Sequence, residues 1–324
     1  MIKNFLKYHP IHKKLVKYLD SLFILRPSLF FPVWIMIASG MITSSMQNDR
    51  FRIWINEFNL NTFLVFLGVT IICGATFIIN QMQDIVSDQE NDKLVLFKEK
   101  MTQSTADRFY KILMIVSIII LIPTGVINIV LGLLLFLIWG VLYNLKPFEF
   151  KQTPILGAII NLMAGLILFL IGWSLNVDIN FQALILAAPY LLCFTAVSVL
   201  TAIPDMRGDK KINKNTIPVL YGERITIFFA AVFVLIAFGL GYQNDDPIIS
   251  TASLVSLPFY VFNVFSLKLN NILRTIRFSI FNLGFFLMSV YPYLFLAFFV
   301  NFYLVKYYYW HRFDLHYISF LIEE

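Results

Sequence analysis

Nine long apolar stretches constrain the fold of this chain more than any other feature of its sequence. Each is close to the roughly 17–25 residues that a helix needs to cross a bilayer. They cover residues 23–43, 60–83, 110–127, 129–144, 154–174, 181–203, 225–242, 250–267 and 279–304. Because 59% of the 324 residues are hydrophobic and 14% are charged, a soluble domain is excluded. We therefore expect an all-α, polytopic membrane protein with nine transmembrane helices.

The basic residues predict how these helices are oriented. Lys and Arg favour the cytoplasmic side, and with the N-terminus inside, 21 of the 25 Lys and Arg residues lie on that side. Nine spans then leave the C-terminus outside. We expect three segments: a basic amphipathic helix on the membrane surface (1–22), the transmembrane domain (23–305) and an aromatic tail (306–324). The expected location is a prokaryotic cytoplasmic membrane.

Two acidic motifs close predicted helices on the cytoplasmic side. Asn80, Asp84 and Asp88 follow at four-residue intervals at the end of the second span, so they share one helix face. Asp205 and Asp209 close the sixth span, each 121 residues after its counterpart. Spans an even number apart run in the same direction. We interpret the spacing as a parallel repeat of a four-helix unit around a central cavity that opens to the cytoplasm.

The donor chemistry of these motifs indicates Mg²⁺. Carboxylates four residues apart repel one another, and a divalent cation removes that penalty. The four histidines all lie near the termini, which excludes a histidine-based metal site inside the membrane. Oxygen donors alone suit Mg²⁺, which binds through few carboxylates, waters and substrate phosphates. The predicted metal ligands are Asn80, Asp84, Asp88, Asp205 and Asp209.

Basic residues near the acids indicate an anionic ligand for the metal. Lys210, Lys211 and Lys214 follow the second motif, as expected if the metal carries a polyanion such as a diphosphate. The alternative, that the acids only solvate a cytoplasmic loop, stays open. In the loop between the fourth and fifth spans, Tyr143 is either an interface anchor or a catalytic group. Asn161, within the fifth span, is weighed equally as a helix–helix contact and a substrate contact.

In order and spacing, these motifs resemble the UbiA superfamily of intramembrane prenyltransferases. The resemblance spans most of the chain, and its two acidic motifs are those described above. "KNTIPVLYG" (Lys214–Gly222) is similar to the run that leads into the family's seventh helix. The family's Tyr-Pro-Lys loop matches Tyr143, Pro147 and Lys151, and "LRPSLFFPVW" (Leu25–Trp34) resembles its first helix. One departure concerns the loop between the second and third spans. Val95 and Leu96 stand where relatives carry Arg-Pro, with Lys93 and Lys98 as the nearest cations.

The resemblance implies Mg²⁺-dependent transfer of a prenyl group from a polyprenyl diphosphate to a lipophilic acceptor, with release of pyrophosphate. It implies catalytic roles for Asp84, Asp88, Asp205, Asp209 and Tyr143, with Tyr143 and Phe148 near the prenyl cation. The residues expected to bind the diphosphate are Asn80, Arg26, Lys146, Lys151, Lys210 and Lys211. The implied partners are the donor, the acceptor and the bilayer, without nucleic acid.

Other functions remain open at this point. A secondary transporter for an anion or divalent cation also uses acidic helix ends. A CDP-alcohol phosphotransferase is another Mg²⁺-dependent membrane enzyme, but its acidic motif is one contiguous set. The acceptor stays open among a quinone-precursor ring, a glycerol-phosphate lipid, a chlorin and a polyene.

Overall fold

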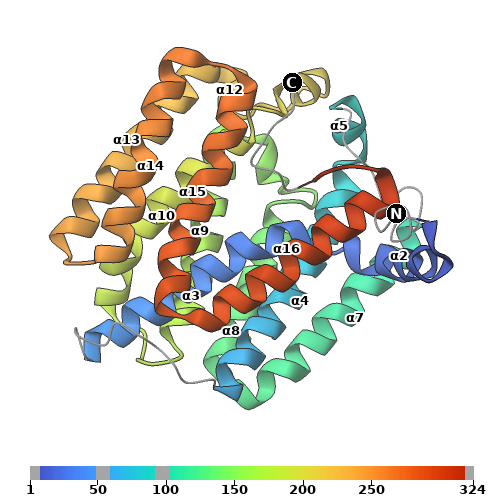
Figure 1. Ribbon diagram of the computed structural model, residues 1–324, viewed down its shortest axis with the longest axis horizontal. Coiled ribbons are helices and arrows are strands. Elements are labelled where there is room, and N and C mark those ends of the chain that lie inside the picture. The colour runs from blue at the N-terminus through green and yellow to red at the C-terminus, as the bar shows by residue number, and fades with distance from the viewer. Residues whose placement is uncertain (1–7, 49–58, 92–101, 318–324) are drawn as a thin grey trace.

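A computed structural model describes residues 8–48, 59–91 and 102–317, and this part of the chain is a bundle of helices without strands (Figure 1). The first half contains α2 (Pro10–Phe23), η1 (Pro27–Leu29), α3 (Phe30–Asn48), α4 (Leu60–Gln83), α5 (Ile85–Glu90), α7 (Gln103–Leu121), η2 (Ile122–Thr124), α8 (Val126–Leu135) and the π-helical η3 (Phe136–Leu142). The second half contains η4 (Phe150–Gln152), α9 (Pro154–Trp173), α10 (Phe181–Thr201), α11 (Met206–Lys211), α12 (Ile217–Tyr221), α13 (Glu223–Gln243), α14 (Pro247–Ser266), α15 (Leu269–Val290) and α16 (Pro292–Phe313).

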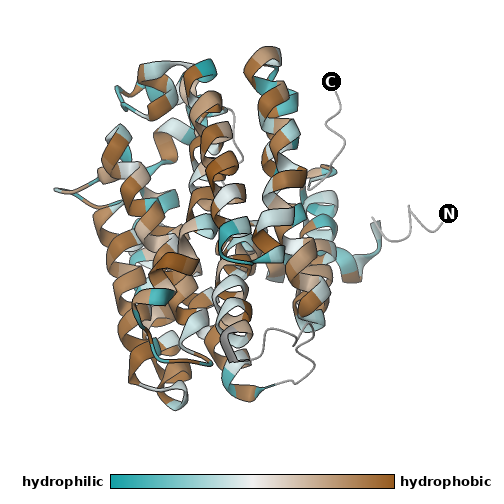
Figure 2. Cartoon of the chain, turned by 90° about the vertical axis from the view of Figure 1, so that its left-hand side faces the viewer, coloured by the Kyte–Doolittle hydropathy of each residue, from teal (hydrophilic) through white to brown (hydrophobic). Residues whose placement is uncertain are grey.

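Seven helices among the described residues are long and apolar enough to cross a membrane: α3 together with η1, then α4, α9, α10, α13, α14 and α15. The expected all-α, multi-pass class is therefore confirmed, whereas the number of nine spans is not. The expected third and fourth spans correspond to α7, whose first turns are polar, and to the shorter apolar run Val126–Leu142. The turn between them contains Gly125, whose φ of 102° favours glycine. In Figure 2, hydrophobic residues dominate the helices and hydrophilic residues gather at their ends.

The prediction of one span over residues 279–304 is wrong. The chain forms two helices there, because α15 ends at Val290 and α16 begins at Pro292. Proline has no backbone N–H and disfavours helical geometry in the residue before it. Tyr291 accordingly has φ −124° and ψ 88°. Arg274 and Arg277, expected in a loop, therefore lie on α15.

This additional helix brings the C-terminal part of the described chain to α2. The last turns of α16 pack on α2, where the Tyr308 hydroxyl donates to Asp20 at 2.6 Å and Arg312 pairs with Asp20 at 3.2 Å. The rings of Phe23 and Tyr308 stack at 3.6 Å. Within the described residues, which end at 317, the chain therefore returns to the side of α2 instead of ending on the opposite side.

Small residues allow the central helices to approach closely. A Cβ on Gly40 of α3 would lie 1.9 Å from the carbonyl oxygen of Phe169, and one on Gly172 of α9 would lie 1.8 Å from that of Ile37. Only glycine fits at such distances, and small residues are the usual means by which membrane helices pack. The α3–α9 contact places the first half of the bundle against the second.

Candidate functional site

Each acidic motif lies where a long helix breaks into a short one. Asp84 ends α4 with φ −96° and ψ 10°, and α5 continues from Ile85. Asp205 similarly separates α10 from α11, after Pro204. Asp88 and Asp209 lie in the first turns of these short helices. Because of the break, the carboxylates of each motif do not share one face of a continuous helix. The two carboxylates of each motif therefore have different neighbours.

The two short helices contact each other directly. The Asn91 side chain accepts a hydrogen bond from the backbone N–H of Gly208 at 2.7 Å and donates one to the carbonyl oxygen of Asp205 at 3.2 Å. A Cβ on Gly208 would lie 2.7 Å from the carbonyl oxygen of Ser87. These contacts place the two acidic motifs side by side, although 121 residues separate them.

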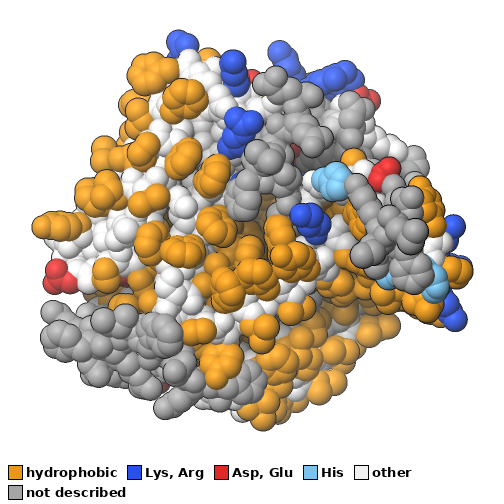
Figure 3. Space-filling view, viewed as in Figure 1, with side chains coloured by type: hydrophobic (Ala, Val, Ile, Leu, Met, Phe, Trp, Pro, Cys, Tyr) orange, Lys and Arg blue, Asp and Glu red, His pale blue; other side chains and the backbone are white. Residues whose placement is uncertain are grey.

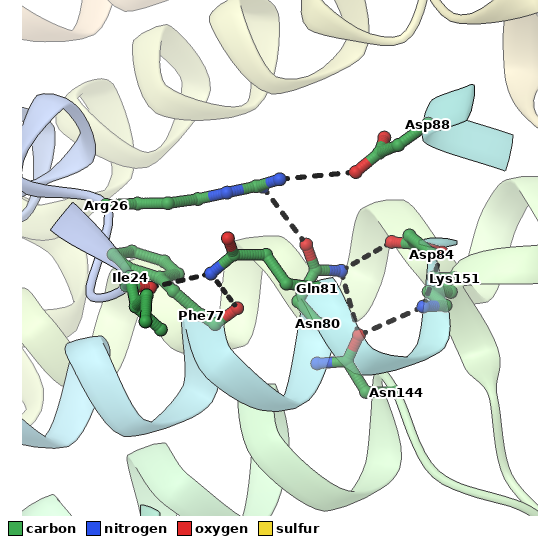
Figure 4. A network of polar contacts seen from close by, with 9 residues as sticks. All are labelled: Ile24, Arg26, Phe77, Asn80, Gln81, Asp84, Asp88, Asn144 and Lys151. Carbon is green, nitrogen blue, oxygen red and sulfur yellow. Dashed lines mark hydrogen bonds and ion pairs between the residues drawn. The ribbon is translucent and has the colours of Figure 1, made fainter. Parts of the chain in front are cut away.

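A buried network surrounds Asp84 (Figure 4). The Lys151 ammonium group lies 2.7 Å from one oxygen of Asp84, and the Asn80 amide donates to the other oxygen at 2.7 Å. Asn144 accepts from Asn80 at 2.9 Å and from Lys151 at 3.2 Å. Only 3% of the Lys151 side chain and 14% of the Asp84 side chain are exposed. This is a desolvated ion pair with its hydrogen bonds satisfied.

Arg26 reaches the same network from the start of the first span. Its guanidinium group pairs with Asp88 at 3.2 Å and donates to the Asn80 oxygen at 3.5 Å (Figure 4). The backbone of Arg26 is left-handed, with φ 53°, where the chain turns from α2 into η1. The Gln81 amide donates to the carbonyl oxygen of Ile24 at 2.7 Å and so ties this turn to α4.

The second motif has its own cation. Lys214 lies 3.2 Å from Asp209, a residue that is only 2% exposed. The sequence indicates Lys214 as one of three lysines beside the acids, without a role of its own. Its signal was its place at the start of the "KNTIPVLYG" run, but sequence spacing alone does not distinguish it from its neighbours. Asn144 and Asn91 were missed because amides at loop positions carry no motif.

Burial and neighbouring charges shift the pKa values of the two motifs in opposite directions. Burial raises the pKa of Asp84, but Lys151 and Lys214 outweigh it, so its pKa lies below the usual range. Burial raises the pKa of Asp209 above its usual range, with Lys214 acting in the opposite direction. Burial also lowers the pKa of Lys151, although Asp84 opposes this. The site is thus a set of charges whose ionised forms depend on one another.

Three of the predicted diphosphate ligands lie at exposed positions. Lys146, Lys210 and Lys211 are exposed, and Lys211 pairs with Glu90. Phe148, predicted near the prenyl cation, is 45% exposed. The structure instead brings together Arg26, Asn80, Asp84, Asp88 and Lys151, and beside them Asp209 with Lys214. Lys93, Val95, Leu96 and Lys98, the positions of the departure from the family pattern, lie outside the described residues.

A polar cavity and an apolar cavity meet beside these charges. The polar cavity, about 140 Å³, is lined by Tyr143, Lys151, Asp205, Asp209 and Lys214 among others. The apolar cavity, about 280 Å³, includes Trp139 and Phe194 in its wall. Both include Asn161, Ser198 and Thr201 in their linings.

Asn161 accepts a hydrogen bond from the Trp139 indole at 2.9 Å and donates one to Ser198 at 3.0 Å. This is the helix–helix contact that the sequence left open for it. Among the described residues, no group of three His, Cys, Asp or Glu side chains is arranged to hold a metal ion.

A comparison with known protein families identifies the class of this protein. The model of the UbiA prenyltransferase family matches residues 33–290, and the chain belongs to this family. Membership does not support the secondary transporter that the sequence left open.

The curated relatives match only part of their length. The chain is 26% identical over 237 residues to 2-acyl-4-prenylphloroglucinol 6-prenyltransferase, chloroplastic, of Humulus lupulus. The matched region covers 66% of this chain and 54% of that protein. The chain is also 28% identical over 103 residues to digeranylgeranylglyceryl phosphate synthase of Methanobrevibacter smithii. This second match covers 30% of this chain and 35% of that protein. The chain thus spans about half of the first relative and a third of the second.

The solved structures share the fold over nearly their whole length. A UbiA homologue from Archaeoglobus fulgidus, bound to GPP and Mg²⁺, superposes with a TM-score of 0.63 at 18% identity. That match covers 85% of this chain and 99% of the homologue. A structure described for digeranylgeranylglyceryl phosphate synthase in membranes has a TM-score of 0.60 at 20% identity and covers 86% of this chain and 97% of its own.

Proposed function

We propose that this chain is a membrane prenyltransferase that moves a prenyl group from a polyprenyl diphosphate to a lipophilic acceptor and releases pyrophosphate. The observation that carries the proposal is the junction of the two cavities at Asn161, Ser198 and Thr201. A molecule with a charged head and an apolar tail fits such a junction. The relatives named above as prenyltransferase and synthase, and the homologue solved with GPP and Mg²⁺, support this class of donor.

The residues of the site fit Mg²⁺ by their donor chemistry. Asn80, Asp84, Asp88, Asp205 and Asp209 offer only oxygen ligands, and Mg²⁺ completes such a set with waters and substrate phosphates. When bound, Mg²⁺ supplies Lewis acidity that neutralises the charge on the departing diphosphate. The cations already present, Arg26, Lys151 and Lys214, would face the same anion.

The chain's own residues supply binding and exclusion of water. In the proposed reaction the bond between the prenyl C1 and the diphosphate oxygen breaks, and its electron pair leaves with pyrophosphate. Lys151 and Lys214 stabilise that charge in a partly dry site, where fixed cations act more strongly than in water. The wall of Trp139 and Phe194 keeps the allylic cation from water, while Tyr143 borders the polar side. The acceptor nucleophile then bonds to C1 and loses a proton.

A single incubation tests this proposal. Membranes containing the protein receive labelled geranylgeranyl diphosphate, Mg²⁺ and a panel of an aromatic acid, a glycerol-phosphate lipid, a chlorin and a polyene. We expect Mg²⁺-dependent pyrophosphate release together with one prenylated product in mass spectrometry. If no acceptor is prenylated and no pyrophosphate appears above control membranes, the proposal is wrong.

A further inference from the structure

Helix α16 lies beyond the matched range 33–290, yet it forms one wall of a third cavity. This chamber of about 540 Å³ lies between η1, α15 and α16. One face of α16 contributes Phe298, Asn301 and Phe302 to the lining. Phe299 and Val300, which lie between them in the sequence, are exposed on another face of the helix. The Asn301 amide donates to the carbonyl oxygen of Pro27 at 3.0 Å and so holds α16 against η1.

The chamber reaches the charged site from a separate direction. Asp205 and Thr201 line both the chamber and the polar cavity. The chamber also shares Leu29, Pro32 and Ile280 with the apolar cavity proposed for the prenyl tail. A reaction between two lipophilic molecules needs two binding spaces that converge near one carbon atom. The chamber meets this requirement for the second substrate.

The lining predicts the chemistry of that substrate. Arg26 and Arg277 lie in the chamber wall with Asp205, and aromatic rings cover another part of it. A guanidinium group has five N–H donors and binds carboxylate or phosphate in a bidentate manner, so the contacts that Arg26 makes to Asp88 and Asn80 leave it further donors. Phe281 and Phe298, with ring centres 6.5 Å apart, offer a surface for a flat or isoprenoid body.

We propose that this chamber binds the acceptor, that the acceptor is a lipophilic molecule with an anionic carboxylate or phosphate, and that α16 determines which acceptor fits. The inference rests on the proposed prenyl transfer, since it assigns the second substrate of that reaction. It also places a specificity element outside the range that the family model matches.

Two matched pairs of variants test the chamber. Arg277→Gln removes a chamber cation, whereas Arg274→Gln removes a cation one turn earlier on α15, outside the lining. Phe302→Ala enlarges the chamber, whereas Phe299→Ala alters the exposed face of α16. We expect Arg277→Gln to raise the acceptor KM by roughly tenfold or more and to leave the donor KM within about twofold. We expect Phe302→Ala to change the ratio of kcat/KM between a small and a bulky acceptor, with both controls near wild type.

A binding measurement separates this inference from the proposed reaction. The purified full-length protein, without donor, is exposed to two photoactivatable probes, an aromatic carboxylic acid and a glycerol-phosphate lipid, each beside its uncharged ester. We expect one charged probe to label residues 298–302, more than its ester does, and Arg277→Gln to reduce that labelling. The probe that labels these residues shows whether the anionic group of the acceptor is a carboxylate or a phosphate.

The outcomes distinguish the two hypotheses. Labelling confined to the apolar cavity, equal labelling by ester and acid, no labelling by either probe, or equal effects of Arg277→Gln and Arg274→Gln would overturn the acceptor chamber. Wild-type protein that binds a charged probe at residues 298–302 but never releases pyrophosphate would instead refute prenyl transfer and leave the anion-binding chamber standing.

Discussion

At the scale of single residues, the site is defined by pairs of opposite charge. Lys151 pairs with Asp84, Arg26 with Asp88 and Lys214 with Asp209. Lys151 and Arg26 come from segments far from their carboxylates, whereas Lys214 follows Asp209 by five residues. Taking charges out of water is unfavourable unless they are paired and hydrogen-bonded, so these pairs depend on correct folding of several connections at once.

The four aspartates should each be essential. We expect Asp84→Ala, Asp88→Ala, Asp205→Ala and Asp209→Ala each to abolish prenyl transfer, because each removes an oxygen donor that the proposed Mg²⁺–diphosphate complex needs. Steady-state turnover with saturating donor measures this, and membrane extraction checks that the variants still insert. Near-normal turnover in any two variants would refute the assignment.

The lysines allow a sharper comparison, because neighbouring residues in the same loops serve as controls. We expect Lys151→Gln and Lys214→Gln to lower kcat/KM for the donor by about 10- to 150-fold, the equivalent of roughly 1.5–3 kcal/mol for a charge-assisted hydrogen bond. Acceptor KM should change much less. Lys146→Gln and Lys210→Gln, at exposed positions, should stay near wild type.

Breaking a buried ion pair also destabilises folding, so the melting temperature of each variant in detergent is measured beside its kinetics. Lys146, an exposed lysine of the same connection, is the matched control for Lys151. Equal, small effects at Lys151 and Lys146 would remove Lys151 from the donor site.

At the scale of elements, the approach of α5 to α11 sets the geometry of the site. We expect Gly208→Ala to lower donor kcat/KM by about tenfold or more, because its Cβ would lie 2.7 Å from the Ser87 carbonyl oxygen and force the helices apart. Gly239→Ala on α13, with open space around it, is the matched control. Indistinguishable kinetics of the two variants would show that the helix contact does not position the acids.

Helix α2 carries an exposed apolar stripe that we propose lies in the membrane interface. Ile11, Leu15, Tyr18 and Leu22 are all exposed at helical spacing, beside lysines, while the opposite face packs on α16. In proteoliposomes, a spin label at Leu15 should be more accessible to oxygen than to a water-soluble nickel complex. The neighbouring Lys14 should give the reverse, and the same preference at both positions would contradict interfacial binding.

At the scale of the whole molecule, the two acidic motifs lie at the ends of the long helices α4 and α10, near several of the exposed Lys residues. Figure 3 shows many of the Lys and Arg side chains along the upper and right margins and others further in, while hydrophobic side chains cover much of the middle and lower part of this face. We propose that this end faces the cytoplasm, in line with the bias of Lys and Arg toward the inside.

Labelling of introduced cysteines in intact cells tests this topology. We expect a cysteine at Asn244, between α13 and α14, to react with an impermeant thiol reagent, and cysteines at Asn213 and Tyr317 to stay protected. Tyr317 is informative because it lines the chamber together with Arg26 and Asp205, which belong to the end that we propose faces the cytoplasm. The opposite reactivity at all three sites would invert the orientation, and reaction at Tyr317 alone would contradict the return of α16.

The sequence by itself determined the class of fold and the positions of the two acidic motifs. Helix length and hydrophobicity are local properties, and therefore the stretch 60–83 coincides with α4. The four-residue spacing of Asn80, Asp84 and Asp88 and the repeat at Asp205 and Asp209 are likewise readable without tertiary contacts. The resemblance of its loop to the family predicts Lys151 as a residue that binds the diphosphate.

Only the tertiary structure decided which cations enter the site and how the chain ends. Lys146 and Lys151 lie in one connection between long helices, and Lys210 and Lys214 lie in another, yet one lysine of each pair forms an ion pair with an aspartate while the other is exposed. Side-chain direction depends on turns such as η4 and the end of α11, which hydrophobicity does not encode. The break at Pro292 was hidden because apolar residues continue on both sides of it. A hydropathy pattern records how much of a chain is apolar, whereas the path of that chain is settled by which surfaces pack together.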